Sequence, residues 1–169
     1  MEQLQHIIDN LSPILNEYGY AILFAGVFLE GTAIPVPGQS LMIAASCLAV
    51  TSVFDLKLVM LISLLSAFFG NLLGYYIGLN FSNFFKKKGG LSSPTVRKLR
   101  YLLNRNPILI FILSRFMGPI KEITPISCGI FNVSTKDFLI GNFFGSLLWV
   151  LFYCLLFYLA FSGTLLLSN

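Results

Sequence analysis

The sequence predicts an all-helical integral membrane protein with two interrupted helical hairpins, two long membrane-spanning helices and short interfacial helices. Three observations lead to this fold class. Hydrophobic residues make up 56% of the 169 residues, and the mean hydropathy is +0.82, well above the value for a soluble domain of this size. Two apolar segments are long enough to cross a membrane. Two others contain Pro, Gly and charged residues, which a continuous spanning helix disfavours.

In residues 106–133, Arg115, Lys121 and Glu122 lie inside an otherwise apolar run. A charge at membrane depth costs about 3 kcal/mol on insertion scales, so it usually faces a cavity or a partner. Pro and Gly residues interrupt the same run and bend the chain. We therefore expect a re-entrant hairpin that lines a polar path. Its expected breaks are Gly118, Pro119 and Pro125.

Residues 18–53 repeat this pattern around a single acidic residue, Glu30. Each arm beside the break has about 10 to 15 residues, fewer than the roughly 20 that a spanning helix needs. Paired, interrupted apolar segments in the two halves of a chain are typical of a transporter binding site near the membrane midplane. We therefore predict a second re-entrant hairpin and a duplicated design. Its expected breaks are Pro35, Pro37 and Gly38.

The other segments complete one predicted membrane domain over residues 1–169. Residues 1–17 carry apolar side chains at helical spacing, which predicts an amphipathic helix on the membrane surface. They lack a basic region before an uninterrupted apolar core, so we expect no cleaved signal peptide. Residues 57–81 and 137–162 are apolar and long enough to predict two spanning helices.

Small residues recur along one face of the first predicted spanning helix. Gly70, Gly74 and Gly78 are four residues apart, a spacing that lets a neighbouring helix approach closely. We interpret them as a packing surface. Asn71 lies beside this stripe, and its amide needs a hydrogen-bond partner within the membrane.

Residues 86–105 contain seven of the eleven Lys and Arg residues of the chain. Positive charge in a short loop marks the cytoplasmic side and attracts anionic lipid headgroups. This confined distribution argues against nucleic-acid binding, despite the net charge of +4. Residues 95–105 have the pattern of an amphipathic helix at the inner interface. If each hairpin returns to the side it enters, the two hairpins open to opposite sides and bring Glu30 and Arg115 to a similar depth.

Other chemistries find little support in the sequence. Cys47, Cys128 and Cys154 lie in apolar segments without metal-ligand spacing, and His6 is the only histidine. We therefore expect small buried side chains at the three cysteines and neither a metal nor a cofactor. Ser114 lacks a base partner in the sequence pattern, so we expect no enzymatic activity such as that of a membrane phosphatase.

Four motifs in this order resemble those of the DedA family, the bacterial members of the wider VTT or SNARE-associated group. They are FLEGTAIPVPGQ, GNLLGYYIG, SRFMGPIKEITPISCG and FLIGNFFGSLLWV, and the resemblance covers most of the chain from about residue 20 to residue 163. The resemblance implies two re-entrant hairpins in inverted orientation. It also implies lipid translocation: recycling of undecaprenyl phosphate across the bacterial inner membrane, or phospholipid scrambling in eukaryotic relatives. Proton-coupled use of embedded acidic and basic residues is implied as well.

The resemblance carries functional roles to three residues: Glu30 as the hairpin acid, Arg115 as the first arginine and Lys121 as the second basic position. The second basic position is commonly Arg in the family, and Lys121 lacks the planar fork that binds phosphate through two hydrogen bonds. Gln39 and Asn71 stand where the family often has acidic residues.

The last two departures weaken the case for a proton relay built from two carboxylates. Glu30 and Glu122 remain as titratable groups. The candidate translocation site therefore consists of Glu30, Gln39, Asn71, Arg115, Lys121 and Glu122.

The residues themselves support a lipid phosphate as the substrate. Arg115 and Lys121 together can neutralise a phosphate monoester, and helix N-termini after Pro35 or Pro119 would add backbone donors. We expect Glu30 to pair with Arg115 in the absence of substrate and to release it on protonation. The expected partners are membrane lipids and protons, in a multi-pass protein of the bacterial inner membrane.

Several alternatives stay open at this level. The charges could form a permanent ion pair that only locks the hairpins together. A proton-coupled antiporter for small ions or drugs would use the same carboxylate and the same interrupted helices. A purely structural or assembly role is a further alternative. The sequence leaves open which lipid is carried, the direction of transport, and whether the unit is a monomer or a homodimer.

Overall fold

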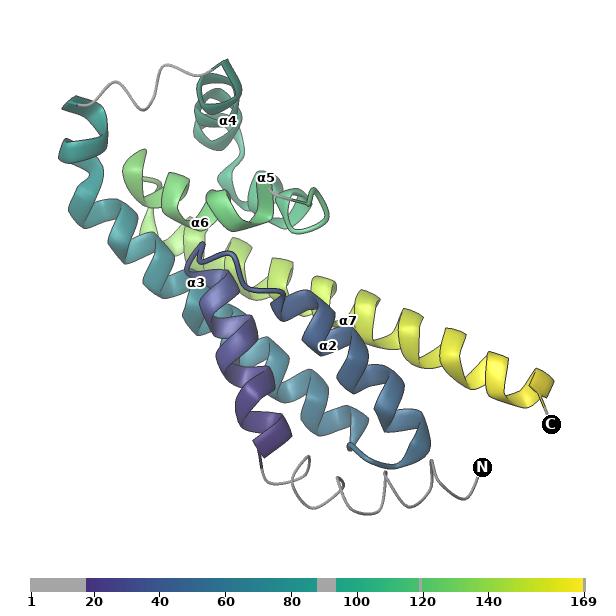
Figure 1. The fold of residues 1–169 in the computed structure, drawn as a ribbon. Coiled ribbons are helices and arrows are strands. Elements are labelled where there is room, and N and C mark those ends of the chain that lie inside the picture. Colours follow the sequence, from purple (N-terminus) through teal and green to yellow (C-terminus); the bar gives the residue numbers. More distant parts are fainter. Residues whose placement is uncertain (1–17, 88–93, 119, 169) are drawn as a thin grey trace.

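The computed structural model describes residues 18–87, 94–118 and 120–168, and the described part is helical without any strand. This confirms the all-helical class. The predicted interfacial helix over residues 1–17 lies outside the described residues. The elements follow one another as the Tyr18–Gly31 helix, α2 (Gly38–Leu48), the 3-10 turn η1 (Ala49–Thr51), α3 (Leu56–Lys87), α4 (Pro94–Arg105), α5 (Pro107–Ser114), α6 (Ile120–Ile130) and α7 (Thr135–Ser168) (Figure 1).

Helices α3 and α7 are long and apolar enough to cross a membrane. Their apolar stretches, Leu56–Ser82 and Thr135–Thr164, contain 27 and 30 residues with mean hydropathies of 2.0 and 2.1. At about 1.5 Å per residue they extend about 40 and 45 Å, more than the roughly 30 Å of a hydrocarbon core. Most of their residues are not buried inside the protein, which leaves large apolar side chains exposed.

Both long helices extend beyond their predicted limits. The predicted span over residues 57–81 belongs to α3, which continues to Lys87 and therefore includes the start of the predicted basic loop. No Gly or Pro interrupts the sequence between residues 79 and 88, so nothing stops the helix there. At its start, the Asp55 carboxylate accepts hydrogen bonds from the backbone N–H groups of Lys57 and Leu58, at 2.7 and 3.1 Å.

The two interrupted segments each form two short helices around a turn. In the first, a turn over residues 32–37 separates the Tyr18–Gly31 helix from α2, and Ala33 has a φ of 64°. In the second, the turn between α5 and α6 contains Gly118 with a φ of 46°. A left-handed residue ends a helix and redirects the chain, and glycine adopts it at least cost. Pro119 lies outside the described residues.

Pro125 does not break the second hairpin, contrary to the sequence-based prediction. It lies inside α6, where its ring removes one helical hydrogen bond without ending the helix. The residue beside it, Thr124, donates its hydroxyl to the Ile120 carbonyl at 2.7 Å. Pro125 also faces Gly74 of α3, whose missing side chain leaves room for the ring. Tertiary packing therefore supports α6 through the proline.

Glycines allow the two long helices to meet the hairpins at close range. Gly70 contacts the Phe28 carbonyl and Gly74 contacts the Gly31 carbonyl, both at the end of the Tyr18–Gly31 helix. Gly78 contacts the backbone of α6 at Ile126. A methyl group at Gly70 or Gly78 would overlap these backbone atoms. The predicted role of this stripe in helix packing is confirmed.

The two halves of the chain are assembled in a similar way. Gly70-Asn71-Leu72-Leu73-Gly74 in α3 matches Gly141-Asn142-Phe143-Phe144-Gly145 in α7 in spacing. The α3 segment packs against the Tyr18–Gly31 helix, which is the first arm of the first hairpin. The α7 segment packs against α5, which is the first arm of the second hairpin. The second arms exchange partners, because α2 packs mainly on α7 and α6 packs on α3 (Figure 1). The hairpin turns therefore meet near the middle of the molecule.

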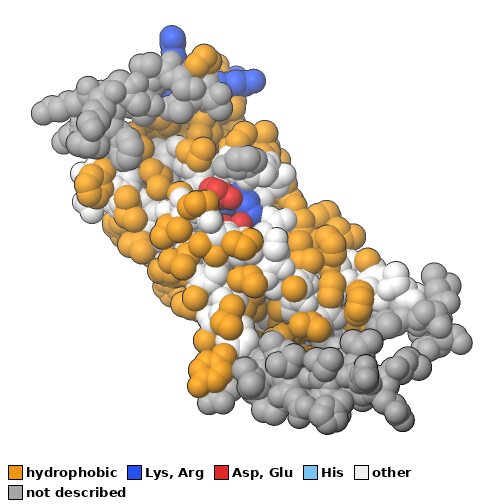
Figure 2. Space-filling model, viewed as in Figure 1, with side chains coloured by type: hydrophobic (Ala, Val, Ile, Leu, Met, Phe, Trp, Pro, Cys, Tyr) orange, Lys and Arg blue, Asp and Glu red, His pale blue; other side chains and the backbone are white. Residues whose placement is uncertain are grey.

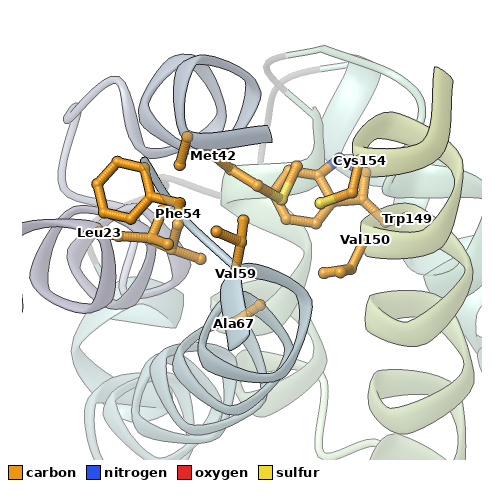
Figure 3. Packing of buried hydrophobic residues seen from close by; sticks show 10 residues of the cluster. Leu23, Met42, Phe54, Val59, Ala67, Trp149, Val150 and Cys154 are labelled. Carbon is orange, nitrogen blue, oxygen red and sulfur yellow. The ribbon is translucent and has the colours of Figure 1, made fainter. Parts of the chain in front are cut away.

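Two apolar clusters fix this arrangement. One surrounds Met42, Val59, Trp149 and Cys154, where α2, α3 and α7 meet (Figure 3). The other surrounds Tyr75, Phe111 and Phe138, and Leu103 of α4 is buried in it. The apolar side of α4, which the sequence assigns to the membrane interface, thus contributes to this second cluster. Its described basic side chains, Arg97, Lys98, Arg100 and Arg105, are exposed.

We expect Gly129→Ala to lower the thermal stability of the detergent-solubilised protein. Gly129 of α6 lies against the backbone of α3 at Tyr75, and an added methyl would overlap it. Overpacking of this kind costs about 1–3 kcal/mol. Gly163→Ala in α7 is the matched control, since nothing lies within 4 Å of the added atom. Equal melting temperatures for the two variants would contradict this packing.

Candidate functional site

The turns of the two hairpins enclose a small polar pocket. Figure 2 shows acidic and basic side chains together near the middle of a largely apolar face. The space is large enough for about one water molecule, with a volume of about 10 Å³. Its lining residues are Val27, Glu30, Gly31, Arg115, Lys121, Glu122 and Trp149.

Lys121 connects the second hairpin to both arms of the first. Its ammonium group lies 2.9 Å from Glu30 Oε1, and both side chains are at least 90% buried. It also donates a hydrogen bond to Gln39 Oε1. Glu30 ends the first arm and Gln39 begins the second, so a single cation holds the two arms of the first hairpin across their turn. Loss of one partner from a buried ion pair strongly destabilises the folded protein, because the other charge is left buried without a partner.

The observed ion pair corrects the prediction that Glu30 pairs with Arg115. Arg115 caps the C-terminal end of α5, and its Nη1 donates to Asn71 Oδ1 of α3 at 3.2 Å. Lys121, in the first turn of α6, is the cation that reaches the first hairpin. In the part of the chain that the structure describes, no carboxylate lies within ion-pair distance of Arg115. This buried guanidinium is therefore held by neutral groups.

Asn71 provides the neutral acceptor because its other end is fixed by α7. Its Nδ2 donates to Asn142 Oδ1 at 2.8 Å and to Ser146 Oγ at 3.3 Å. Asn142 in turn donates to the Phe68 carbonyl of α3 at 3.0 Å. An asparagine can donate to α7 and accept from Arg115 at the same time, whereas an ionised aspartate can only accept. The asparagine at this position thus fits the local hydrogen bonding.

Trp149 forms a wall shared by both cations. The centre of its ring lies 5.1 Å from Arg115 Cζ and 5.1 Å from Lys121 Nζ. Such distances fall within the range of cation–π attraction, for which tryptophan is the strongest partner. The side chain is 1% exposed, and packing against the first apolar cluster fixes its position.

The structure brings the six predicted residues together and adds three more. Glu30, Gln39, Asn71, Arg115 and Lys121 are linked as described above, and Glu122 lines the pocket with a partly exposed side chain. The sequence analysis missed Asn142, Ser146 and Trp149. Two signals could have found them: the repeat of Gly-Asn-x-x-Gly in α3 and α7, and the i, i+4, i+7 spacing that places all three on one face of α7.

The three cysteines are free thiols, and Cys128 and Cys154 are buried as expected whereas Cys47 is half-buried. Within residues 18–87, 94–118 and 120–168, no group of three or more His, Cys, Asp or Glu side chains could hold a metal ion. The chemistry available in the pocket is therefore that of two cations, two carboxylates and the donors around them.

Spanning helices combined with a buried charged pocket define a helical membrane protein, and sequence comparison gives its family. The VTT domain model matches residues 34–159. "Protein DedA" of Escherichia coli strain K12 is 31% identical over 161 residues, which cover 88% of this chain and 73% of that protein. The chain therefore belongs to the DedA family of VTT-domain membrane proteins. The resemblance drawn from the four motifs is confirmed.

Two further relatives match at a lower identity. An "Uncharacterized membrane protein" of Buchnera aphidicola subsp. Baizongia pistaciae is 28% identical over 137 residues, covering 78% of this chain and 53% of the relative. "Inner membrane protein YghB" of Escherichia coli strain K12 is 28% identical over 137 residues, covering 78% of this chain and 63% of YghB. The chain thus spans about half to two thirds of the length of these two proteins. No solved structure matches the chain.

We expect a double-mutant cycle of Asn71→Ala and Asn142→Ala to reveal coupling between α3 and α7. The hydrogen bond between the two amides is lost in each single variant, so the double variant should be less destabilised than the sum. Interhelical hydrogen bonds in membranes average about 0.6 kcal/mol and reach about 1.7 kcal/mol, which sets the expected size. The measurement is the free energy of unfolding in mixed micelles.

A control cycle pairs Asn71→Ala with Ser162→Ala. The Ser162 hydroxyl donates only to the Leu159 carbonyl within α7, so these two changes should be additive. Additivity in both cycles would contradict the observed amide contact.

Proposed function

We propose that this chain is a membrane transporter of the flippase or scramblase type that moves a lipid phosphate across a bacterial inner membrane. Undecaprenyl phosphate and a phospholipid are the candidate substrates, and a proton is the coupled ion. The observation that supports this proposal most directly is the pair of buried cations, Arg115 and Lys121, on one tryptophan ring between two interrupted hairpins. Buried charges within a membrane protein mark a pathway for ions or substrates.

The chemistry of the two cations suits a phosphate group. A phosphate monoester carries a charge of about −1.5 to −2 near neutral pH and has strong acceptor oxygens. Arg115 is free to bind such a group because its present partner is a neutral amide. The hydrocarbon part of a lipid would remain against the exposed apolar side chains of the hairpins and long helices.

The geometry corresponds to a closed conformation. The pocket has space for about one water molecule, and Lys121 already forms an ion pair with Glu30. A lipid headgroup can therefore enter only if the hairpin turns separate and the ion pair between Lys121 and Glu30 breaks. Protonation of Glu30 removes its charge and favours this release, which couples a proton to the arrival of the phosphate.

The short arms of the hairpins support a re-entrant arrangement. Helix α5 has 8 residues and α2 has 11. At about 1.5 Å per residue they extend about 12 and 17 Å, well short of the roughly 30 Å of a hydrocarbon core. The turns would then lie inside the membrane, and the polar groups there are those of the pocket. The basic helix α4 leads into the second hairpin, and its positive charge favours a cytoplasmic location for that entrance.

Thiol labelling in intact cells tests this topology. In a variant with Cys47, Cys128 and Cys154 replaced, we expect Thr51→Cys to react with a membrane-impermeant maleimide added outside. Lys98→Cys should react only after permeabilisation. Both parent residues are exposed: Thr51 lies in η1, just before α3, and Lys98 lies in α4, which follows the other end of α3 (Figure 1). Labelling of both sites from the same side would contradict the inverted arrangement.

Transport by purified protein in liposomes tests the function. With fluorescent phospholipid or undecaprenyl phosphate, we expect Arg115→Gln to reduce lipid movement at least tenfold, because the phosphate loses a charged donor. Glu30→Gln should retain transport but lose its dependence on a proton gradient, because the side chain no longer titrates. Lys136→Gln removes an exposed charge outside the pocket and serves as the control.

Other results would identify another role. Unchanged transport and unchanged proton dependence in both pocket variants would leave Arg115 and Glu30 with a structural role only. Movement of protons with a drug or a small ion, without movement of either lipid, would assign the chain to the antiporters.

A further inference from the structure

We infer that Trp149 is a further binding residue of this pocket, and that its indole N–H donates a hydrogen bond to a phosphate oxygen placed between the two cations. The inference rests on the proposed function, because it concerns the ligand of the same pocket. It adds a donor that neither the motifs nor the family comparison assigned, and it gives the tryptophan a role beyond packing.

The unsatisfied donors of the pocket carry this inference. Among the residues that the structure describes, three buried side-chain nitrogen or oxygen atoms lack a hydrogen-bond partner: Ser63 Oγ, Arg115 Nε and Trp149 Nε1. Two of the three belong to residues that line the pocket. Buried polar groups are nearly always paired, so two unpaired groups around one cavity call for an explanation.

The identity of these atoms restricts the ligand to one that accepts hydrogen bonds. The indole nitrogen and the guanidinium Nε are donors only, so neither can be satisfied by a cation or by another donor. A group that accepts hydrogen bonds at several oxygens and carries negative charge satisfies both donors and both cations. A phosphate group with several free oxygens has these properties, whether it is inorganic phosphate or a phosphate monoester at the head of a lipid.

The tryptophan is held firmly enough to act as such a donor. Figure 3 shows Trp149 beside Met42, Val150 and Cys154 in the first apolar cluster. Its ring is also in contact distance of Tyr153, with centroids 5.9 Å apart. A rigid donor keeps its orientation as the ligand arrives and loses little entropy. The attraction of the ring for both cations offsets part of their mutual repulsion.

The chain contains a single tryptophan, so its fluorescence reports on this pocket alone. The first arm of the experiment titrates the detergent-solubilised wild-type chain with inorganic phosphate and, separately, with dodecyl phosphate. We expect a saturable change in Trp149 emission with dodecyl phosphate, because the ligand hydrogen-bonds to the emitting group. Saturation by inorganic phosphate at similar concentrations would identify free phosphate, rather than a lipid headgroup, as the source of the ligand.

The second arm compares Trp149→Phe with wild type by isothermal titration calorimetry of the better ligand. Phenylalanine keeps an aromatic ring for the cations but removes the N–H, so we expect the dissociation constant to rise about tenfold, or about 1.4 kcal/mol. Tyr153→Phe is the matched control, because it removes a polar group from the neighbouring aromatic residue, which does not line the pocket. Its affinity should equal that of wild type. Thermal unfolding of each variant verifies its fold.

The outcomes separate this inference from the proposed function. Arg115→Gln should abolish binding if the pocket is an anion site. Loss of binding in Arg115→Gln, together with wild-type affinity in Trp149→Phe and unchanged emission in wild type, would overturn the role of the indole and leave the proposed function intact. Absence of binding of either phosphate by wild type would overturn both. A change in emission on its own supports the inference even if Trp149→Phe fails to fold.

Discussion

The constraint on which this structure depends is the burial of two cations inside an apolar helical protein. A charge that loses water must gain partners, and the surrounding residues are arranged to supply them. Lys121 forms an ion pair with Glu30 and donates a hydrogen bond to the Gln39 amide oxygen. Arg115 donates a hydrogen bond to the amide oxygen of Asn71. The interrupted helices make this possible, because each turn brings the end of one short helix and the start of the next into the protein interior.

The two cations are stabilised by different means. Lys121 is paired with the Glu30 carboxylate and also donates to Gln39. Arg115 is held by the amide of Asn71, whose other end is fixed to α7. The proposed coupling to a proton rests on this difference, because only one of the two cations has an acidic partner among the described residues.

The exchange of partners between the halves connects the pocket to the rest of the molecule. Because α2 packs mainly on α7 and α6 packs on α3, neither hairpin belongs only to its own long helix. The glycine contacts hold each long helix close to the hairpins, and the two long helices meet directly through the amides of Asn71 and Asn142. Lys121 and Glu30 belong to different hairpins, so a movement of one hairpin relative to the other would separate them.

The sequence by itself determined the helical class, the two long apolar helices, the two interrupted segments and the charged residues of the pocket. Hydropathy, proline and glycine act on their neighbours along the chain, so a single sequence records their effects. Only the tertiary structure decided that Glu30 pairs with Lys121 instead of Arg115, that Pro125 stays within α6, and that Asn142, Ser146 and Trp149 complete the site. These outcomes depend on how each helix is rotated about its axis and on contacts between distant segments, and local patterns do not encode either.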